Sequence, residues 1–129
     1  MYNTYLNIIT EKLIEKINYL EGKFTEIDAV IEDIPGEFVI RPSFNFGLDE
    51  QFSNLRNIET DVIFTLQIFC PHNSNFDITG LASALKKNIY MITGQTIEDK
   101  LFLIRTIDLI KNDDSAFKSI NVQITVNIL

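Results

Sequence analysis

Residues 121–129 read NVQITVNIL, and this stretch decides the fold. Polar and apolar residues alternate along it, which is the pattern of a β-strand with one face in a core and one face outward. The outward side chains are polar and uncharged, so this face suits a protein neighbour as well as water. A domain that ends in a sheet strand is complete only when that strand is made. We therefore expect residues 1–129 to form one whole domain that begins near Met1.

The composition is typical of a single globular domain. The 129 residues fall in the usual size range, and 46% of them are apolar, ten of them Phe, which is enough for a core without disulfides or metals. The single cysteine, Cys70, excludes an internal disulfide and fits a reducing compartment. No apolar run approaches the roughly 18 to 20 residues of a membrane helix, so we expect no membrane partner.

The charge balance argues against nucleic-acid binding. The chain has 18 acidic and 11 basic residues, a formal net charge of -7, and its only adjacent basic pair is Lys86-Lys87. Binding to phosphates requires clustered Lys and Arg side chains that displace counterions. An acidic surface instead repels polyanions, which is useful where DNA must pass through a channel without sticking.

Two amphipathic helices are predicted. The first covers residues 4–20 and ends at Gly22, and the second covers residues 78–92, with Asp77 as its N-cap and Gly94 as its terminator. The apolar stripe of the first helix consists of Leu6, Ile9, Leu13, Ile17 and Leu20, widened by Tyr5, Ile14 and Tyr19.

The remaining apolar segments predict strands. Residues 38–46 and 59–70 read as a long antiparallel hairpin around a loop at 47–58. Pro42 predicts either an edge position for the first strand or a β-bulge within it. Residues 27–34 read as a short strand that ends at Pro35-Gly36.

Residues 100–110 are apolar at both alternating sets of positions, which predicts a strand that is central or covered on both sides, although a helical interpretation stays open. The order of elements is helix, short strand, two strands, helix, two strands. We therefore predict an α+β fold, with an antiparallel or mixed sheet and two main helices packed on one face.

No residue pattern indicates catalysis, a metal or a cofactor. Cys70 and His72 flank Pro71 at a strand end, where a thiol and an imidazole point apart, and a structural zinc needs about four such ligands. The acidic pairs at 49–50, 98–99 and 113–114 are typical of solvated turns and do not match a calcium loop. We predict that the protein is not an enzyme, and we expect no catalytic, metal or cofactor-binding residues.

The outward faces of the predicted strands are candidate interfaces. The strand at 59–70 has one mixed face that we expect to be half-buried. A charge such as Arg105 in an apolar strand needs a partner, either Asp61 or Asp108 within the fold or a residue of a neighbouring subunit. The predicted interface residues are Arg41, Asp61, Ile63, Gln67, Phe69, Arg105, Gln123 and Thr125.

The element order resembles a known family. An N-terminal helix, a long hairpin (38–46 and 59–70), a Leu/Ala/Ile helix at 81–92 and a final alternating strand are similar to the tail terminator and tail completion proteins of tailed bacteriophages, and small neck and minor capsid proteins share this pattern. The resemblance implies a virion protein that is assembled in the host cytoplasm. It forms a homo-oligomeric ring, usually a hexamer, on the tail tube protein and meets the head-proximal connector protein, while DNA passes through without specific binding.

Two other classes remain open. A small monomeric ligand-binding or regulatory α+β module has the same elements and requires a concave apolar pocket. A small enzyme is the weakest interpretation and requires a pocket in which Arg105 meets carboxylates. The assembly hypothesis predicts that Gln67→Glu weakens association and leaves the monomer folded.

Overall fold

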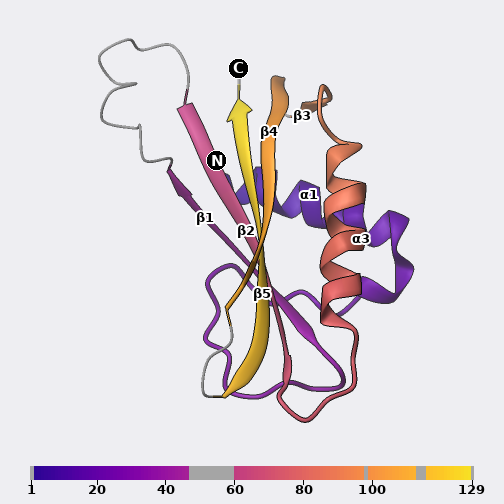
Figure 1. Cartoon of the computed structure of the whole chain (residues 1–129). Helices are drawn as coiled ribbons and strands as arrows, with labels where there is room; N and C mark the ends of the chain where they lie inside the picture. The colour runs from indigo at the N-terminus through magenta and orange to yellow at the C-terminus, as the bar shows by residue number, and fades with distance from the viewer. Residues whose placement is uncertain (1, 47–59, 98, 113–115, 129) are drawn as a thin grey trace.

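The protein folds as one antiparallel sheet with two helices against it, as Figure 1 shows. The computed structural model describes residues 2–46, 60–97, 99–112 and 116–128. The strand order is β1-β2-β5-β4-β3, and every neighbouring pair is antiparallel. The elements are α1 (Tyr2–Lys16), η1 (Asn18–Leu20), β1 (Val39–Phe46), β2 (Thr60–Pro71), α3 (Ile78–Tyr90), β3 (Thr96–Ile97), β4 (Lys100–Lys111) and β5 (Phe117–Ile128). The predicted α+β class is confirmed.

The C-terminal strand β5 lies in the middle of the sheet, between β2 and β4. Its alternation has the predicted consequence, because Val122, Ile124 and Val126 are all 0% exposed. Ile124 lies opposite Phe64 on β2 and opposite Ile107 on β4, so its side chain is packed from both sides.

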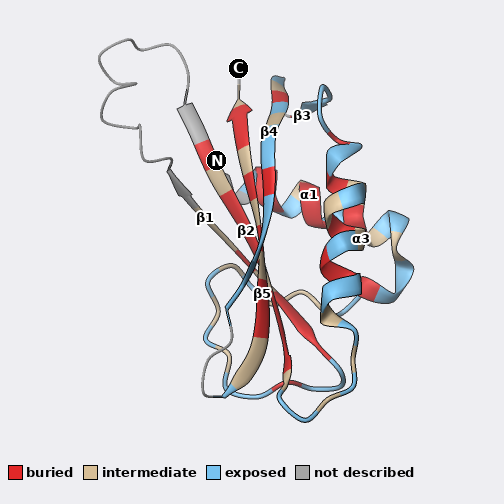
Figure 2. Cartoon of the chain, in the orientation of Figure 1, coloured by how far each residue is buried: buried red, intermediate tan, exposed pale blue. Residues whose placement is uncertain are grey.

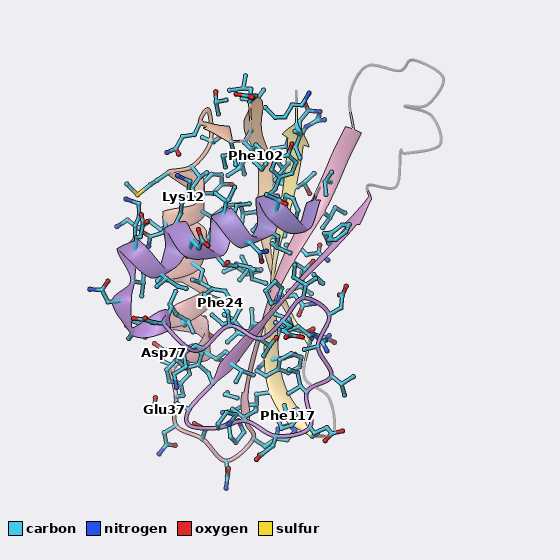
Figure 3. All side chains as sticks on the ribbon, turned by 180° about the vertical axis from the view of Figure 1, so that it is seen from behind. Lys12, Phe24, Glu37, Asp77, Phe102 and Phe117 are labelled. Carbon is cyan, nitrogen blue, oxygen red and sulfur yellow. The ribbon has the colours of Figure 1, made fainter. Side chains whose placement is uncertain are left out.

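Both helices cover one face of the sheet, and α1 runs across α3 (Figures 1 and 3). Figure 2 shows their buried stripes facing the strands, and the Tyr5 ring meets the Phe102 ring edge-on at a centroid distance of 5.0 Å. Tyr19 was expected in the first stripe but is 58% exposed, because it lies in η1, after α1 has ended at Lys16. Among the described residues, no helix has the length and apolar character needed to cross a membrane.

The predicted hairpin is confirmed, and Pro42 lies on the edge strand β1. The backbone N–H of Ile40 donates to Lys23 O, and Ile40 O accepts from Thr25 N, so both groups of Ile40 point away from β2. Pro42 is two residues further along and has the same orientation. Its missing N–H therefore removes no hydrogen bond from the sheet. The loop predicted at 47–58 lies outside the described residues.

Residues 23–37 form what we call the covering segment, and the short strand predicted at 27–34 is wrong. The segment first follows the outer edge of β1, where Asp28 N donates to Pro42 O at 3.0 Å. Asp28 has a positive φ of 59°, which is incompatible with a continuous strand. The chain then places Ile31 and Ile34 against the sheet in a second, smaller hydrophobic cluster.

Residues 100–110 are a strand, as predicted, and the helical alternative is wrong. The expectation of a central or doubly covered strand is also wrong, because β3 pairs only with Lys100 and Leu101. The register shifts between Ile104 and Thr106, so Arg105 is an extra residue in a β-bulge. The bulge moves the core-facing positions from 102 and 104 to 107 and 109. Core-facing residues have even numbers before the bulge and odd numbers after it. In the sequence, this single core-facing side therefore looks like two apolar faces.

The N-cap of α3 provides the first test of these contacts. Asp77 Oδ1 accepts from Gly80 N at 2.9 Å, as predicted for an N-cap. A Cβ atom on Gly80 would overlap Asp77 Oδ2 and lie 2.8 Å from Cγ. We therefore expect Gly80→Ala to bring no stability in the parent protein, because the helix-propensity gain of roughly 1 kcal/mol is offset by loss of the cap. In an Asp77→Ala background the same change should stabilise by about that amount.

Urea unfolding of the parent, the two single variants and the double variant measures this coupling. Equal effects of Gly80→Ala in both backgrounds would show that the cap tolerates a methyl group.

Candidate functional site: the helix-free face of the sheet

The side of the sheet opposite α1 and α3 is the surface on which the predicted interface residues can meet. We call it the helix-free face. Along each strand, the residues of this face alternate with the buried core residues, so the register shows which residues lie on it. Its central residues are Arg41, Ser43, Ile63, Thr65, Gln67, Thr106, Asp108, Ile110, Asn121, Gln123 and Thr125.

The register brings three of the predicted interface residues together. Ile63 on β2 lies directly opposite Thr125 on β5, and Gln123 lies two residues along β5 from Thr125, opposite Thr65. Ile63, Gln123 and Thr125 are all half-buried in the single chain. They form an uncharged patch of mixed apolar and polar character in the middle of the sheet.

Arg41 and Gln67 are also adjacent, but they bind each other. Arg41 Nη2 donates to Gln67 Oε1 at 2.5 Å, and Arg41 Nη1 donates to the carbonyl oxygen of Ala29 in the covering segment at 3.0 Å. Gln67→Glu would place a carboxylate beside this guanidinium and favour the folded monomer. Gln67 is therefore a poor position for separating association from folding.

Phe69 differs most from its predicted role. It is only 4% exposed, so the expectation that this position is half-buried and open to a neighbour is wrong. Its ring lies edge-on to Phe117 at 6.0 Å, and the Arg41 guanidinium carbon lies 5.0 Å from its centroid. The covering segment adds Ile31 and Ile34 to this cluster. In the single chain Phe69 is an interior residue.

The last two predicted interface residues are not part of the central patch. Arg105 is the exposed extra residue of the β4 bulge, beside Thr106, which pairs with Thr125. Asp61 pairs through its backbone with Asn127 near the end of β5, and its side chain lies outside the described residues. Arg105 thus borders the patch of Ile63, Gln123 and Thr125.

Asn121 is a residue of this face that the sequence did not single out. Its Oδ1 atom is buried and has no hydrogen-bond donor within the described part of the chain. Such an acceptor costs roughly 1–3 kcal/mol. Three further polar residues of this side, Thr65, Ser119 and Asn127, are buried at 8%, 1% and 5% exposure. The Ser119 hydroxyl donates to the carbonyl oxygen of Asn112, so this polar group is satisfied within the chain.

Those of the residues considered for catalysis and metal binding that the structure describes are not assembled into a site. Cys70 is buried on the core side of β2, and His72 is exposed beyond Pro71. Across the described ranges, no group of three or more His, Cys, Asp or Glu side chains is placed to hold a metal ion. Of the three acidic pairs, only Asp99 is described, as an exposed turn residue with a φ of 62°.

Comparison of the chain with known protein families and with curated proteins found no match. The resemblance to tail terminator proteins therefore rests on the order of the elements. The chemistry of the helix-free face is the second observation that bears on function.

Proposed function

We propose that this chain is a structural subunit of a bacteriophage tail, of the tail terminator or tail completion type. In this role it forms a homo-oligomeric ring of six subunits on the end of the tail tube. The ring caps the tube protein, meets the head-proximal connector and resides in the virion. The order of α1, the β1–β2 hairpin, α3 and the last strand supports the family, and the helix-free face supports assembly.

The observation that carries the proposal is the scarcity of charged side chains on the part of that face formed by β1, β2 and β5; Asp108 lies on the β4 part. Arg41 is the one charged side chain that the structure describes on this face of β1, β2 and β5, and it binds Gln67 and Ala29 within the chain. The centres of protein interfaces are depleted in charged residues, whereas a sheet surface that only meets water has no such need. The patch of Ile63, Gln123 and Thr125 is therefore suited to a neighbouring subunit.

The overall charge suits the same role. With 18 acidic and 11 basic residues, the chain has a net charge of -7. A ring of such subunits repels the DNA phosphates and has no tendency to retain DNA that moves through its lumen. The proposal therefore includes passage of DNA without specific binding.

Gln123→Lys tests the face without disturbing the monomer. Gln123 lies opposite Asp108 in the register, so a lysine there gains a cross-strand partner and the fold should be kept. In an assembled ring the new ion pair must lose water against the neighbouring subunit, which is unfavourable. We expect the apparent association constant to fall by about ten-fold or more. Light scattering after size exclusion, across protein concentration and salt, measures it.

The matched control is Gln95→Lys, which makes the same change at an exposed turn residue. It should assemble like the parent, as a ring of about six subunits whose lumen, in negative-stain microscopy, is wide enough for duplex DNA. In urea unfolding, the free energy of unfolding of both variants should equal that of the parent to within about 0.5 kcal/mol. A parent protein that forms no closed ring at any concentration, or equal assembly of the two variants, would contradict the proposal.

A further inference from the structure

Along the outer edge of β4, the backbone N–H and C=O groups find hydrogen-bond partners within the chain only in the first half of the strand. Gly94 N donates to Phe102 O at 2.7 Å, and Phe102 N donates to Gln95 O at 3.0 Å. Ile104 N donates to the hydroxyl of Thr93 at 3.0 Å. The turn before β3 therefore covers this edge as far as the bulge at Arg105.

Beyond the bulge the edge is open. Asn112 N donates to Ser119 O on β5, so residues 106, 108, 110 and 112 direct their backbone groups toward β5. Residues 107, 109 and 111 direct theirs outward. For these outward groups no hydrogen bond is found within the described part of the chain. We call residues 107–111 the open edge.

The side chains of the open edge are unusually apolar for a strand that meets water. Leu109 is 37% exposed and Ile110 is 41% exposed. Sheet edges with unpaired backbone groups and apolar side chains are templates for another strand. The exposed charges on this stretch are Asp108 and Lys111.

The opposite edge of the sheet is already covered at Ile40 and Pro42. Along β1 the outward groups of Ile40 and the carbonyl of Pro42 are already bound by Lys23, Thr25 and Asp28 of the covering segment. Pairing of β4 with residues 40–42 of β1 of another copy would first have to displace that segment. Pairing of the open edge with the open edge of a second copy requires no such displacement, and it is closed by a two-fold axis.

Charge disfavours two of the possible registers of that pairing. Centring the axis on Asp108 sets two aspartates directly opposite each other, and centring it on Lys111 does the same for two lysines, which is unfavourable. With Leu109 opposite Leu109 of the second copy, Ile107 faces Lys111 and Asp108 faces Ile110. This register uses residues 107, 109 and 111 of each copy and sets no like charges opposite each other.

We propose that two copies of this chain pair antiparallel through residues 107–111, centred on Leu109, and so join their sheets into one. The pairing does not depend on the tail role. The proposed ring contacts use Ile63, Gln123 and Thr125. Gln123→Lys substitutes no residue of the open edge; on β4 the lysine lies opposite Asp108, whose backbone groups point toward β5 and not outward. Edge pairing is therefore best measured in the Gln123→Lys background, where loss of the ring and loss of the dimer are separate results.

Leu109→Pro is the sharpest variant. The N–H of Leu109 points away from β5, so a proline at this edge position removes no hydrogen bond from the monomer but blocks the pairing. In the Gln123→Lys background, we expect sedimentation to show a dimer that forms with increasing protein concentration. Leu109→Pro in that background should stay monomeric at the same concentrations, with far-UV circular dichroism like that of its parent.

A second pair of variants keeps the test decisive if the proline variant fails to fold. Leu103 and Leu109 lie on the same strand and are both 37% exposed, but only Leu109 is on the open edge. Leu109→Lys sets two lysines opposite each other and should raise the dimer dissociation constant about ten-fold or more, whereas Leu103→Lys should leave it nearly unchanged. The proposal would be overturned if the protein stayed monomeric at every concentration, which would mean that the charges protect the edge. It would also be overturned if the two lysine variants had equal effects.

Discussion

Phe64→Ala is expected to destabilise the protein by about 3–5 kcal/mol, the usual result of removing a fully buried phenylalanine. Phe64 is 0% exposed and lies on β2 between Phe44 of β1 and Ile124 of β5. The cavity would open where the sheet meets the helices, and the surrounding strands are too well paired to close it. Urea unfolding followed by circular dichroism should show a lower midpoint with an unchanged slope.

The control for this variant is Met91→Ala, at a residue that is 58% exposed at the end of α3. It should change the free energy of unfolding by no more than about 0.5 kcal/mol. Phe64→Leu should fall between the two variants, because it removes less volume. If Phe64→Ala cost no more than Met91→Ala, the core would not be centred on this strand.

Phe69→Ala is expected to have the second large effect, and it tests the correction to the predicted interface. The side chain is 4% exposed and is packed under the covering segment, so its removal should also cost about 3–5 kcal/mol. Loss of the ring removes the contacts of Ile31 and Ile34 and the aromatic surface beside Arg41. The covering segment should therefore open locally before the protein unfolds globally.

Limited proteolysis with thermolysin detects that local opening. The enzyme cuts before large apolar residues, and Val30, which is 82% exposed, lies in the covering segment. We expect faster cleavage there in Phe69→Ala than in Ile63→Ala, since Ile63 lies on the same face of β2 outside the second cluster. If Phe69→Ala were as stable and as resistant as the parent while its assembly was lost, Phe69 would be an interface residue after all.

The candidate site was predictable where it depends on alternation alone. Gln123 and Thr125 were placed on the outward face of the last strand, and Ile63 on the mixed face of the preceding one. The register then set Ile63 and Thr125 opposite each other. Phe69 obeys the same alternation, but a segment from far earlier in the chain covers it, and no pattern within residues 59–70 indicates that contact.

The sequence by itself determined the two main helices, the strands β1, β2 and β5, and the N-cap at Asp77, and Pro42 restricted its strand to an edge or a bulge. Each of these depends on geometry within one element, where spacing in the sequence equals spacing in space. Only the tertiary structure decided the central place of β5, the bulge at Arg105, the burial of Phe69 and the open edge at 107–111. These features depend on contacts between residues far apart in the chain. The free energy of such a contact depends on both segments, so the pattern within one segment does not predict it.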